Sequence, residues 1–342
     1  MRITPRHLLA AALTAAALVL PVAAPAAAAP TLNRADAAAG WLARQLVDGE
    51  RFEVVFDGVT YPDQGLTIDA IFAFAATKTG GTYASNAIGW LAEPGIRTGY
   101  IGDGTDEAYV GGTAKLALAA QVTGADATAF GGVDLITRLR GLQTPSGRFS
   151  DQSAYGDYTN SFTQSFAILT LDRTAAGAPA TAVSYLAGSR CADGGYPLYL
   201  EQATCVSDVD ATALATQALI SAGDLVHAWP GLTWLVGQQQ PGGGFATYGT
   251  VNANSTGLAA AALQTGGRLL AAAKARAFLR SLQVNCSGPV ATRGAISYTT
   301  GAFDPATAPR ATAQGALGLA ATGYATLSLT GATPSAPTLA CP

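Results

Sequence analysis

Asp210-Ala-Thr-Ala-Leu-Ala-Thr-Gln-Ala-Leu219 is one copy of a short element that occurs six times in the chain. The other copies begin at Asp69, Gly111, Asn160, Asn254 and Arg310, with 42 to 56 residues between successive starts. Four of the six copies open with Asp or Asn, which cap helix N-termini by accepting a backbone N–H bond. The residues that follow are small and apolar on all sides, as in a helix buried all round. The repeat therefore predicts six inner helices.

Between these copies lie segments with one apolar stripe and one polar face. They cover residues 36–46, 83–91, 125–142, 181–186, 225–236 and 270–282. A stripe of this kind is typical of a surface helix that packs against a core on one side. We expect these six segments to be outer helices, one for each inner helix.

The connection from outer to inner helix also recurs. It reads Gln143-Thr-Pro-Ser-Gly-Arg-Phe149, Gly194-Gly-Tyr196 and Gln239-Gln-Pro-Gly-Gly-Gly-Phe245. Glycine permits a left-handed turn after a helix, and the aromatic side chain can fold back over the helix ends. Because one helix pair cannot bury its own apolar face, neighbouring pairs must stack, and six pairs can close into a ring. An open arc of helix pairs is the alternative.

These repeats resemble those of the prenyltransferase and squalene-cyclase toroids, a fold shared with cobalamin carriers of the transcobalamin type. Residues 234–245 are similar to the Gln–aromatic motif of the cyclases, and the resemblance extends over residues 33–325. It implies an all-α fold, an α/α toroid of about six helix-pair repeats. The same scaffold hosts enzymes and carriers, so the resemblance does not decide the activity.

The N-terminal segment has the features of an export signal. Two arginines precede an apolar stretch over residues 8–22, and small residues follow at 26–28. We expect a signal peptide at 1–28, a toroid domain at 29–325 and a C-terminal tail at 326–342, in a protein that is secreted or associated with the cell wall. Residues 29–342 contain 17 basic and 22 acidic side chains, which disfavours nucleic acid as a partner. They contain no apolar run long enough for a membrane span.

All four cysteines, Cys191, Cys205, Cys286 and Cys341, follow the expected cleavage site. An even number in an exported chain indicates disulfide bonds, and three connectivities are possible. Cys191 and Cys205 bracket one loop, so the simplest pairing joins these two and ties Cys341 in the tail to Cys286.

The N-termini of the inner helices and their leading loops should gather at one end of the ring. Those loops are rich in Asp, Asn and Tyr, and helix capping explains the acidic residues but not the tyrosines. Aromatic surface with a few convergent polar groups is typical of a small-molecule site. We expect ligand binding by Asp106, Phe149, Asp157, Tyr158, Asn160, Tyr196, Phe245, Tyr248, Asn254 and Tyr298.

The segment Asp208-Val-Asp210-Ala-Thr-Ala resembles the Asp-x-Asp-Asp-Thr-Ala motif of class II terpene cyclases, whose middle Asp protonates an alkene. The resemblance implies that Asp210 is a general acid supported by Asp208, although Ala211 replaces the third carboxyl group. The competing interpretation, which we favour from the sequence, makes Asp210 a helix cap like Asn160 and Asn254 in the neighbouring repeats.

Other chemistries are disfavoured by the residues present. His227 is the one histidine after the signal segment, which argues against a zinc prenyltransferase and a Ser-His-Asp hydrolase. We expect no metal and no cofactor. The expected function is a secreted toroid that binds an unknown small molecule or extracellular partner. The residues favour binding over catalysis but do not decide whether the protein is also an enzyme. The alternatives are a terpene-cyclase-like enzyme, a carbohydrate-active enzyme using paired carboxylates, and a cell-surface structural module.

Overall fold

The computed structural model describes residues 29–342, so the expected signal peptide lies outside the described residues. Helices dominate the described chain, as the sequence predicts. The inner helices are α2 (Gln64–Thr77), α5 (Val110–Thr123), α7 (Ser161–Asp172), α9 (Val209–Ser221), α11 (Ala253–Thr265) and α13 (Ala308–Ala320). The outer helices are α1 (Arg34–Ala43), α3 (Gly81–Leu91), α6 (Leu135–Gly141), α8 (Ala180–Gly188), α10 (Leu225–Gln238) and α12 (Leu269–Leu282), and α4 (Pro94–Ile101) is additional.

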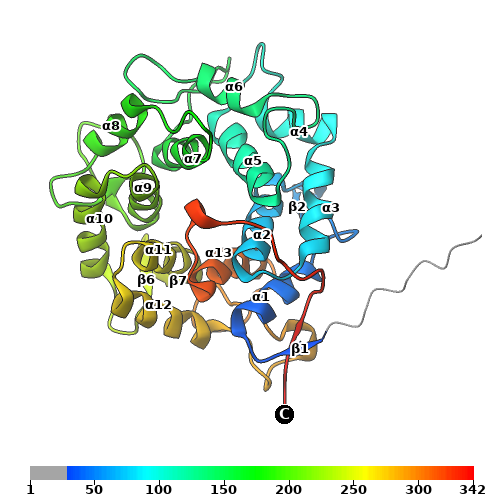
Figure 1. The fold of residues 1–342 in the computed structure, drawn as a ribbon. Helices are drawn as coiled ribbons and strands as arrows, with labels where there is room; N and C mark the ends of the chain where they lie inside the picture. The colour runs from blue at the N-terminus through cyan, green and yellow to red at the C-terminus, as the bar shows by residue number, and fades with distance from the viewer. Residues whose placement is uncertain (1–28) are drawn as a thin grey trace, which may run out of the picture.

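The inner helices form a closed ring, with the outer helices around it (Figure 1). Each inner helix packs against the next in chain order, and α13 packs against α2 to complete the circle. Alanine dominates the buried inner faces, which allows this close approach of helices. The prediction of an all-α, six-pair toroid is confirmed, and the open arc is wrong.

The predicted helix starts are only partly right. Asn160 does cap α7, accepting from the backbone N–H groups of Phe162 and Thr163. The caps of α9 and α11 are instead Asp208 and Asn252, each two residues before the predicted cap. The capping interpretation of Asp210 and Asn254 is therefore wrong, because both residues lie inside the first helical turn.

Glutamine side chains join two of the repeats to the repeat that follows. The Nε2 group of Gln239 donates to Gly243 O in its own loop and to Ala271 O in α12, both at 2.9 Å. Gln283 makes the same pair of bonds, to Gly294 O and to Arg34 O of α1, across the closure of the ring. Gly243 has a φ of 92°, and a Cβ there would lie 2.4 Å from Lys274 O, so the motif requires glycine at this position.

A second recurring hydrogen bond joins the loop to the inner helix. The backbone N–H groups of Phe52, Tyr196, Phe245 and Ile296 donate to the hydroxyls of Thr67, Thr212, Thr256 and Thr312, at 2.8–2.9 Å. In α7 a glutamine, Gln164, accepts the corresponding bond from Phe149 N. Each threonine thus satisfies a buried backbone donor at the turn into its helix.

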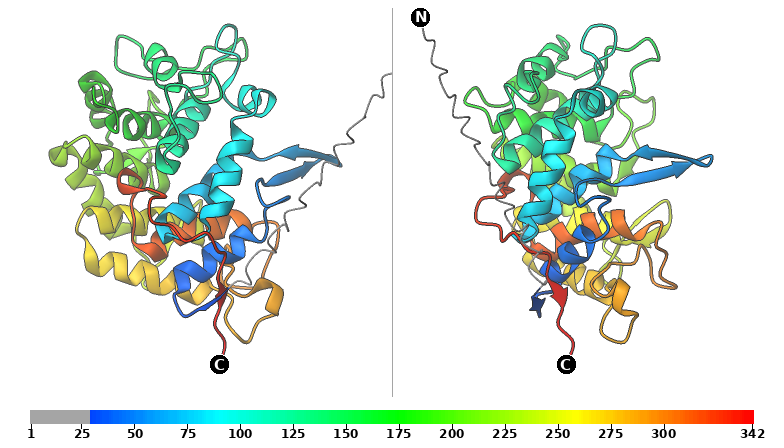
Figure 2. Two further views of the ribbon diagram at one scale, coloured as in Figure 1. Left: turned by 45° about the vertical axis from the view of Figure 1, so that its right-hand side comes forward. Right: turned by 90° about the vertical axis from the view of Figure 1, so that its right-hand side faces the viewer.

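Both predicted disulfides form, Cys191 with Cys205 and Cys286 with Cys341. The C-terminal segment crosses the end of the ring where the inner helices finish, drawn red in Figures 1 and 2. Arg173 at the end of α7 donates to the carbonyls of Ala325 and Leu327. The segment then pairs with the first strand, as β8 (Thr338–Leu339) lies parallel to β1 (Pro30–Thr31). This C-terminal strap closes one end of the ring.

Three hairpins lead into inner helices at the opposite end. They are β2 (Glu53–Phe56) with β3 (Val59–Pro62), β4 (Tyr196–Pro197) with β5 (Ser207–Asp208), and β6 (Phe245–Thr247) with β7 (Thr250–Asn252). The first hairpin projects from the body of the molecule (Figure 2). The other two frame the site described next.

Candidate functional site

The mouth of the ring, where the inner helices begin, carries a groove of about 710 Å³ between the β4–β5 and β6–β7 hairpins. Its aromatic walls are Tyr199, Trp234 and Tyr248. Its polar lining includes Asp208, Thr247 and Gln238. The groove combines aromatic surface with few polar groups, as small-molecule sites do.

Tyr248 is placed at the groove by an unusual turn. It has a φ of 51° and is followed by Gly249 with a φ of 78°, so both residues at the tip of the β6–β7 hairpin are left-handed. A bulky residue rarely adopts this conformation, which Asn or Gly fills in most hairpins. The Tyr248 side chain is 86% exposed and therefore contributes nothing to the core to offset that strain. Backbone strain of this kind clusters at functional sites.

Asp208 and Asp210 have different surroundings at the start of α9. Asp208 Oδ1 accepts from the backbone N–H of Ala211 at 2.8 Å. Asp210 has its Oδ1 atom shielded from solvent without a hydrogen-bond partner. Burial raises the pKa of Asp210 to about 6, the Ser255 and Thr247 hydroxyls oppose this rise, and the negative charge of Asp208 adds to it. A carboxyl group with this pKa can hold or release a proton near neutral pH.

The interior of the ring contains an ion-pair cluster on the side formed by α2, α5 and α13. Asp69 Oδ1 on α2 lies 2.6 Å from Lys115 Nζ on α5, and Asp69 Oδ2 lies 3.3 Å from Arg310 Nη1 on α13. Arg310 also pairs with Asp63 at 2.9 Å. Two acidic and two basic groups thus balance one another here. Asp210 lies on the other side of the ring, on α9.

Tyr324 forms the floor of this interior. Its ring contacts Phe72 of α2 and Phe166 of α7 edge to face, with centroids 5.5 and 5.3 Å apart. Its backbone N–H donates to Gln217 Oε1 of α9. Burial, followed by the charges of Asp69 and Asp210, raises the pKa of Tyr324 well above its ordinary value.

Several predicted ligand-binding aromatics are not available to a ligand. Phe149, Tyr196 and Phe245 are 0% exposed and lie in the hydrophobic core, covering the helix ends. Their prediction as ligand contacts is wrong, because the loop motif buries its aromatic residue. Tyr298 is half-buried and packs against the same core. Tyr158 is 74% exposed and, like Tyr248, is free to contact a ligand.

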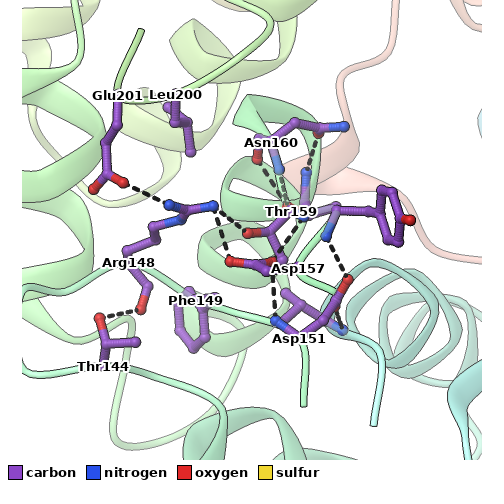
Figure 3. A network of polar contacts seen from close by, with 12 residues as sticks. Thr144, Arg148, Phe149, Asp151, Asp157, Thr159, Asn160, Leu200 and Glu201 are labelled. Carbon is purple, nitrogen blue, oxygen red and sulfur yellow. Dashed lines mark hydrogen bonds and ion pairs between the residues drawn. The ribbon is translucent and has the colours of Figure 1, made fainter. Parts of the chain in front are cut away.

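Asp157, a predicted ligand contact on the neighbouring rim, is engaged within the protein (Figure 3). Arg148 pairs with Asp157 at 2.9 Å and with Glu201 at 2.6 Å. Asp157 Oδ1 also accepts from the backbone N–H groups of Asp151 and Thr159. Burial raises the pKa of Asp157, but the Thr159 hydroxyl, these backbone donors and Arg148 together hold that pKa below its usual value. This network orders the loop before α7 and leaves Asp157 with no free oxygen for catalysis.

Two remaining predicted residues lie in different settings. Asp106 is exposed, in a turn where Asp103 Oδ1 accepts its backbone N–H at 2.9 Å. Asn254 occupies in α11 the position of Asp210 in α9, and its Oδ1 is likewise shielded and without a partner.

Residues 29–342 contain no cluster of His, Cys, Asp and Glu suited to a metal ion. None of the helices in that range is long and apolar enough to span a membrane.

No protein-family model matches the sequence, and no curated protein matches it. Solved structures with a similar fold include a protein from Actinoplanes, with a TM-score of 0.61 and 15% identity over 84% of this chain and 98% of that one. The type II terpene cyclase MstE from Scytonema matches with a TM-score of 0.60 and 15% identity, over 85% of this chain and 98% of the cyclase. An unsaturated glucuronyl hydrolase specific for heparin matches with a TM-score of 0.57 and 12% identity, over 84% of this chain and 95% of the hydrolase. The chain thus has the α/α-toroid fold of the terpene cyclases and glucuronyl hydrolases.

Proposed function

We propose that this protein is an extracellular binding protein that captures a small molecule at the mouth of its toroid. The observation that carries the proposal is the groove between the β4–β5 and β6–β7 hairpins, with a volume of about 710 Å³ and three aromatic walls. Two disulfide bonds fit a location in an oxidising compartment outside the cell. Export would follow from the expected signal peptide at 1–28.

A library of small metabolites screened by thermal shift tests this proposal. A compound that binds the folded state at 100 times its Kd stabilises that state by about 2.7 kcal/mol. Ala203 lines the groove from an exposed loop, so Ala203→Trp should fill the groove without disturbing the core. Ala129→Trp, at an exposed loop position that does not line the groove, is the matched control. Hits should stabilise the wild type and Ala129→Trp but not Ala203→Trp. Equal stabilisation of all three, or no hit, would contradict the proposal.

One observation favours a second candidate function, proton transfer to an isoprenoid by Asp210. Its shielded carboxyl oxygen lacks a backbone donor, which suits a group that must keep its proton until substrate arrives. The likeness to MstE spans 98% of that cyclase, so a cyclase of similar length exists with this fold. Incubation of the wild type with isoprenoid substrates should then give cyclised products that Asp210→Asn does not form. Absence of turnover by the wild type would remove this candidate.

The likeness to a glucuronyl hydrolase supports a carbohydrate-active role less well. Asp151 accepts hydrogen bonds from the backbone N–H groups of Val110 and Tyr158. Asp157 accepts from those of Asp151 and Thr159. Asp157 is also paired with Arg148. Carboxylates held in this way stabilise a loop and are poorly placed for acid–base work on a sugar.

A further inference from the structure

Charge is distributed unevenly in the groove. Among its fifteen lining residues Asp208 is the single ionisable group apart from the tyrosines, and Lys, Arg and His are absent from the lining. Asp208 Oδ1 caps α9, and within residues 29–342 no backbone or side-chain group donates to Oδ2. The groove therefore presents one negative charge that nothing in its own lining neutralises.

Two more carboxylates stand behind the groove wall. Asp193 accepts from Trp234 Nε1 at 3.0 Å and from Ser207 Oγ at 2.6 Å, so it fixes the indole ring that forms one wall. Asp210, two residues further along α9, is close enough to Asp208 for the charge of Asp208 to raise its pKa. The basic groups of the ring interior, Lys115 and Arg310, are already paired with Asp63 and Asp69. The local field at the groove is thus negative.

The aromatic walls have the chemistry that complements this field. A cation is attracted to the face of Trp or Tyr within about 6 Å of the ring centroid, by roughly 0.5–2 kcal/mol. Trp234, Tyr199 and Tyr248 all line the same groove as Asp208. Tyr199 is 63% exposed and Tyr248 86% exposed, so both rings are accessible. An aromatic cage around one carboxylate is the pattern used to recognise quaternary ammonium groups.

We infer that the groove binds an organic cation, with an ammonium group held by Asp208 among Tyr199, Trp234 and Tyr248. This inference rests on the proposed binding function and names its ligand class. The neighbouring pocket of about 480 Å³, which shares Pro197, Tyr199 and Gln202 with the groove, can receive the rest of a larger ligand. That second pocket contains Glu201, which is already paired with Arg148, and Arg190, so the part of a ligand that enters it should be neutral or negatively charged.

A matched pair of probes tests the inference. Choline and 3,3-dimethylbutan-1-ol have the same shape and hydroxyl group, but a neutral carbon replaces the ammonium nitrogen in the second. Calorimetry on the whole protein should show choline binding at least about tenfold more tightly. Asp208→Asn keeps a side chain that can cap α9 and should abolish this preference. Asp134→Asn, at the cap of α6 away from the groove, is the control and should leave the preference unchanged.

The outcomes separate this inference from the proposal on which it rests. If the two probes bind equally, and Ala203→Trp abolishes both, the groove is a small-molecule site but the cation inference is wrong. Preference for choline that survives Asp208→Asn would also overturn the inference, because the charge would then lie elsewhere. So would failure of choline to bind at 20 mM while metabolites from the thermal-shift screen do bind. Melting curves of each variant verify that it is folded.

Discussion

Asp208 and Asp210 stand two residues apart at the start of α9, yet only Asp208 accepts a backbone hydrogen bond, from Ala211 N at 2.8 Å. The two carboxyl groups therefore differ in what they contribute. Asp208 stabilises the helix, whereas Asp210 is held in a buried site that disfavours its charged form. Substitution of each residue should give opposite results.

Replacement of Asp208 should reveal its capping role. Asp208→Ala removes the acceptor for Ala211 N and should lower the free energy of unfolding by about 1 kcal/mol, whereas Asp208→Asn should cost well under that. Urea unfolding of the two variants at pH 7 measures the difference. If both variants were equally destabilised, charge rather than capping would account for the role of Asp208.

Asp210 should make the protein less stable as pH rises. Its pKa is about 6 in the folded protein against an ordinary value of 3.8, so the folded state binds more protons than the unfolded state between these values. The contribution of Asp210 to the free energy of unfolding is complete below pH 3.8 and is lost as pH rises through 6. This loss in the free energy of unfolding is on the order of 3 kcal/mol.

Asp210→Asn removes that titration. The variant should be more stable than the wild type at pH 7.5, by about 1–3 kcal/mol, and this advantage should shrink toward pH 4.5. Urea unfolding of both proteins across this range gives the difference, in which the titrations of other carboxylates cancel. A difference independent of pH would mean that Asp210 is not perturbed.

The threonine bonds to the loop predict a pair of contrasting variants. Thr256→Val leaves the buried N–H of Phe245 without its acceptor and should cost about 1–3 kcal/mol. Thr113 occupies the corresponding position in α5, but its hydroxyl is shielded and has no partner. Thr113→Val should therefore be neutral or stabilising. Thermal melting of the two variants checks this, and equal losses would show that the hydroxyl bonds contribute little.

The two disulfides should differ in their contributions to stability. The Cys286–Cys341 bond closes a loop with a sequence separation of 55, against 14 for Cys191–Cys205. Loop-closure entropy then gives about 4 kcal/mol for the first and about 3 kcal/mol for the second. Double Cys→Ala variants of each pair, compared by urea unfolding, measure these terms. A greater loss in the free energy of unfolding on removal of Cys191–Cys205, which closes the shorter loop, would contradict the entropic account.

The sequence predicts the ring well because its determinants are local and repeated. Small residues in the inner segments, glycine after the outer helices and the glutamine motif each act within one repeat or between neighbours. Gln239 and Gly243 show this, since the motif residues bond directly to one another. The sequence predicts the cysteine pairing for the same reason, because Cys191 and Cys205 bracket a single loop.

The site was harder to predict, because capping and burial depend on backbone geometry. Both Asp-x-Asp in α9 and Asn-x-Asn in α11 offer two possible caps, and composition does not choose between Asp208 and Asp210. The aromatic residues of the loop motif looked like ligand contacts, whereas residues such as Phe245 are core. The repeated threonines, exemplified by Thr212 and Thr256, were a visible signal for the loop-to-helix bond. The placement of Tyr324 on the ring axis depends on long-range packing that no local pattern carries.

The bond from Gln283 to Arg34 joins the last loop of the circle to the first outer helix. The packing of α13 against α2 closes the inner ring, so every inner helix has an inner neighbour on each side. A linear stack of repeats frays from its two ends, where the outermost units have one neighbour only. In the circular arrangement, opening any helix pair exposes two interfaces at once. Amide hydrogens in α2 and α13 should therefore exchange with solvent as slowly as those in α7, and the molecule should unfold as one cooperative body.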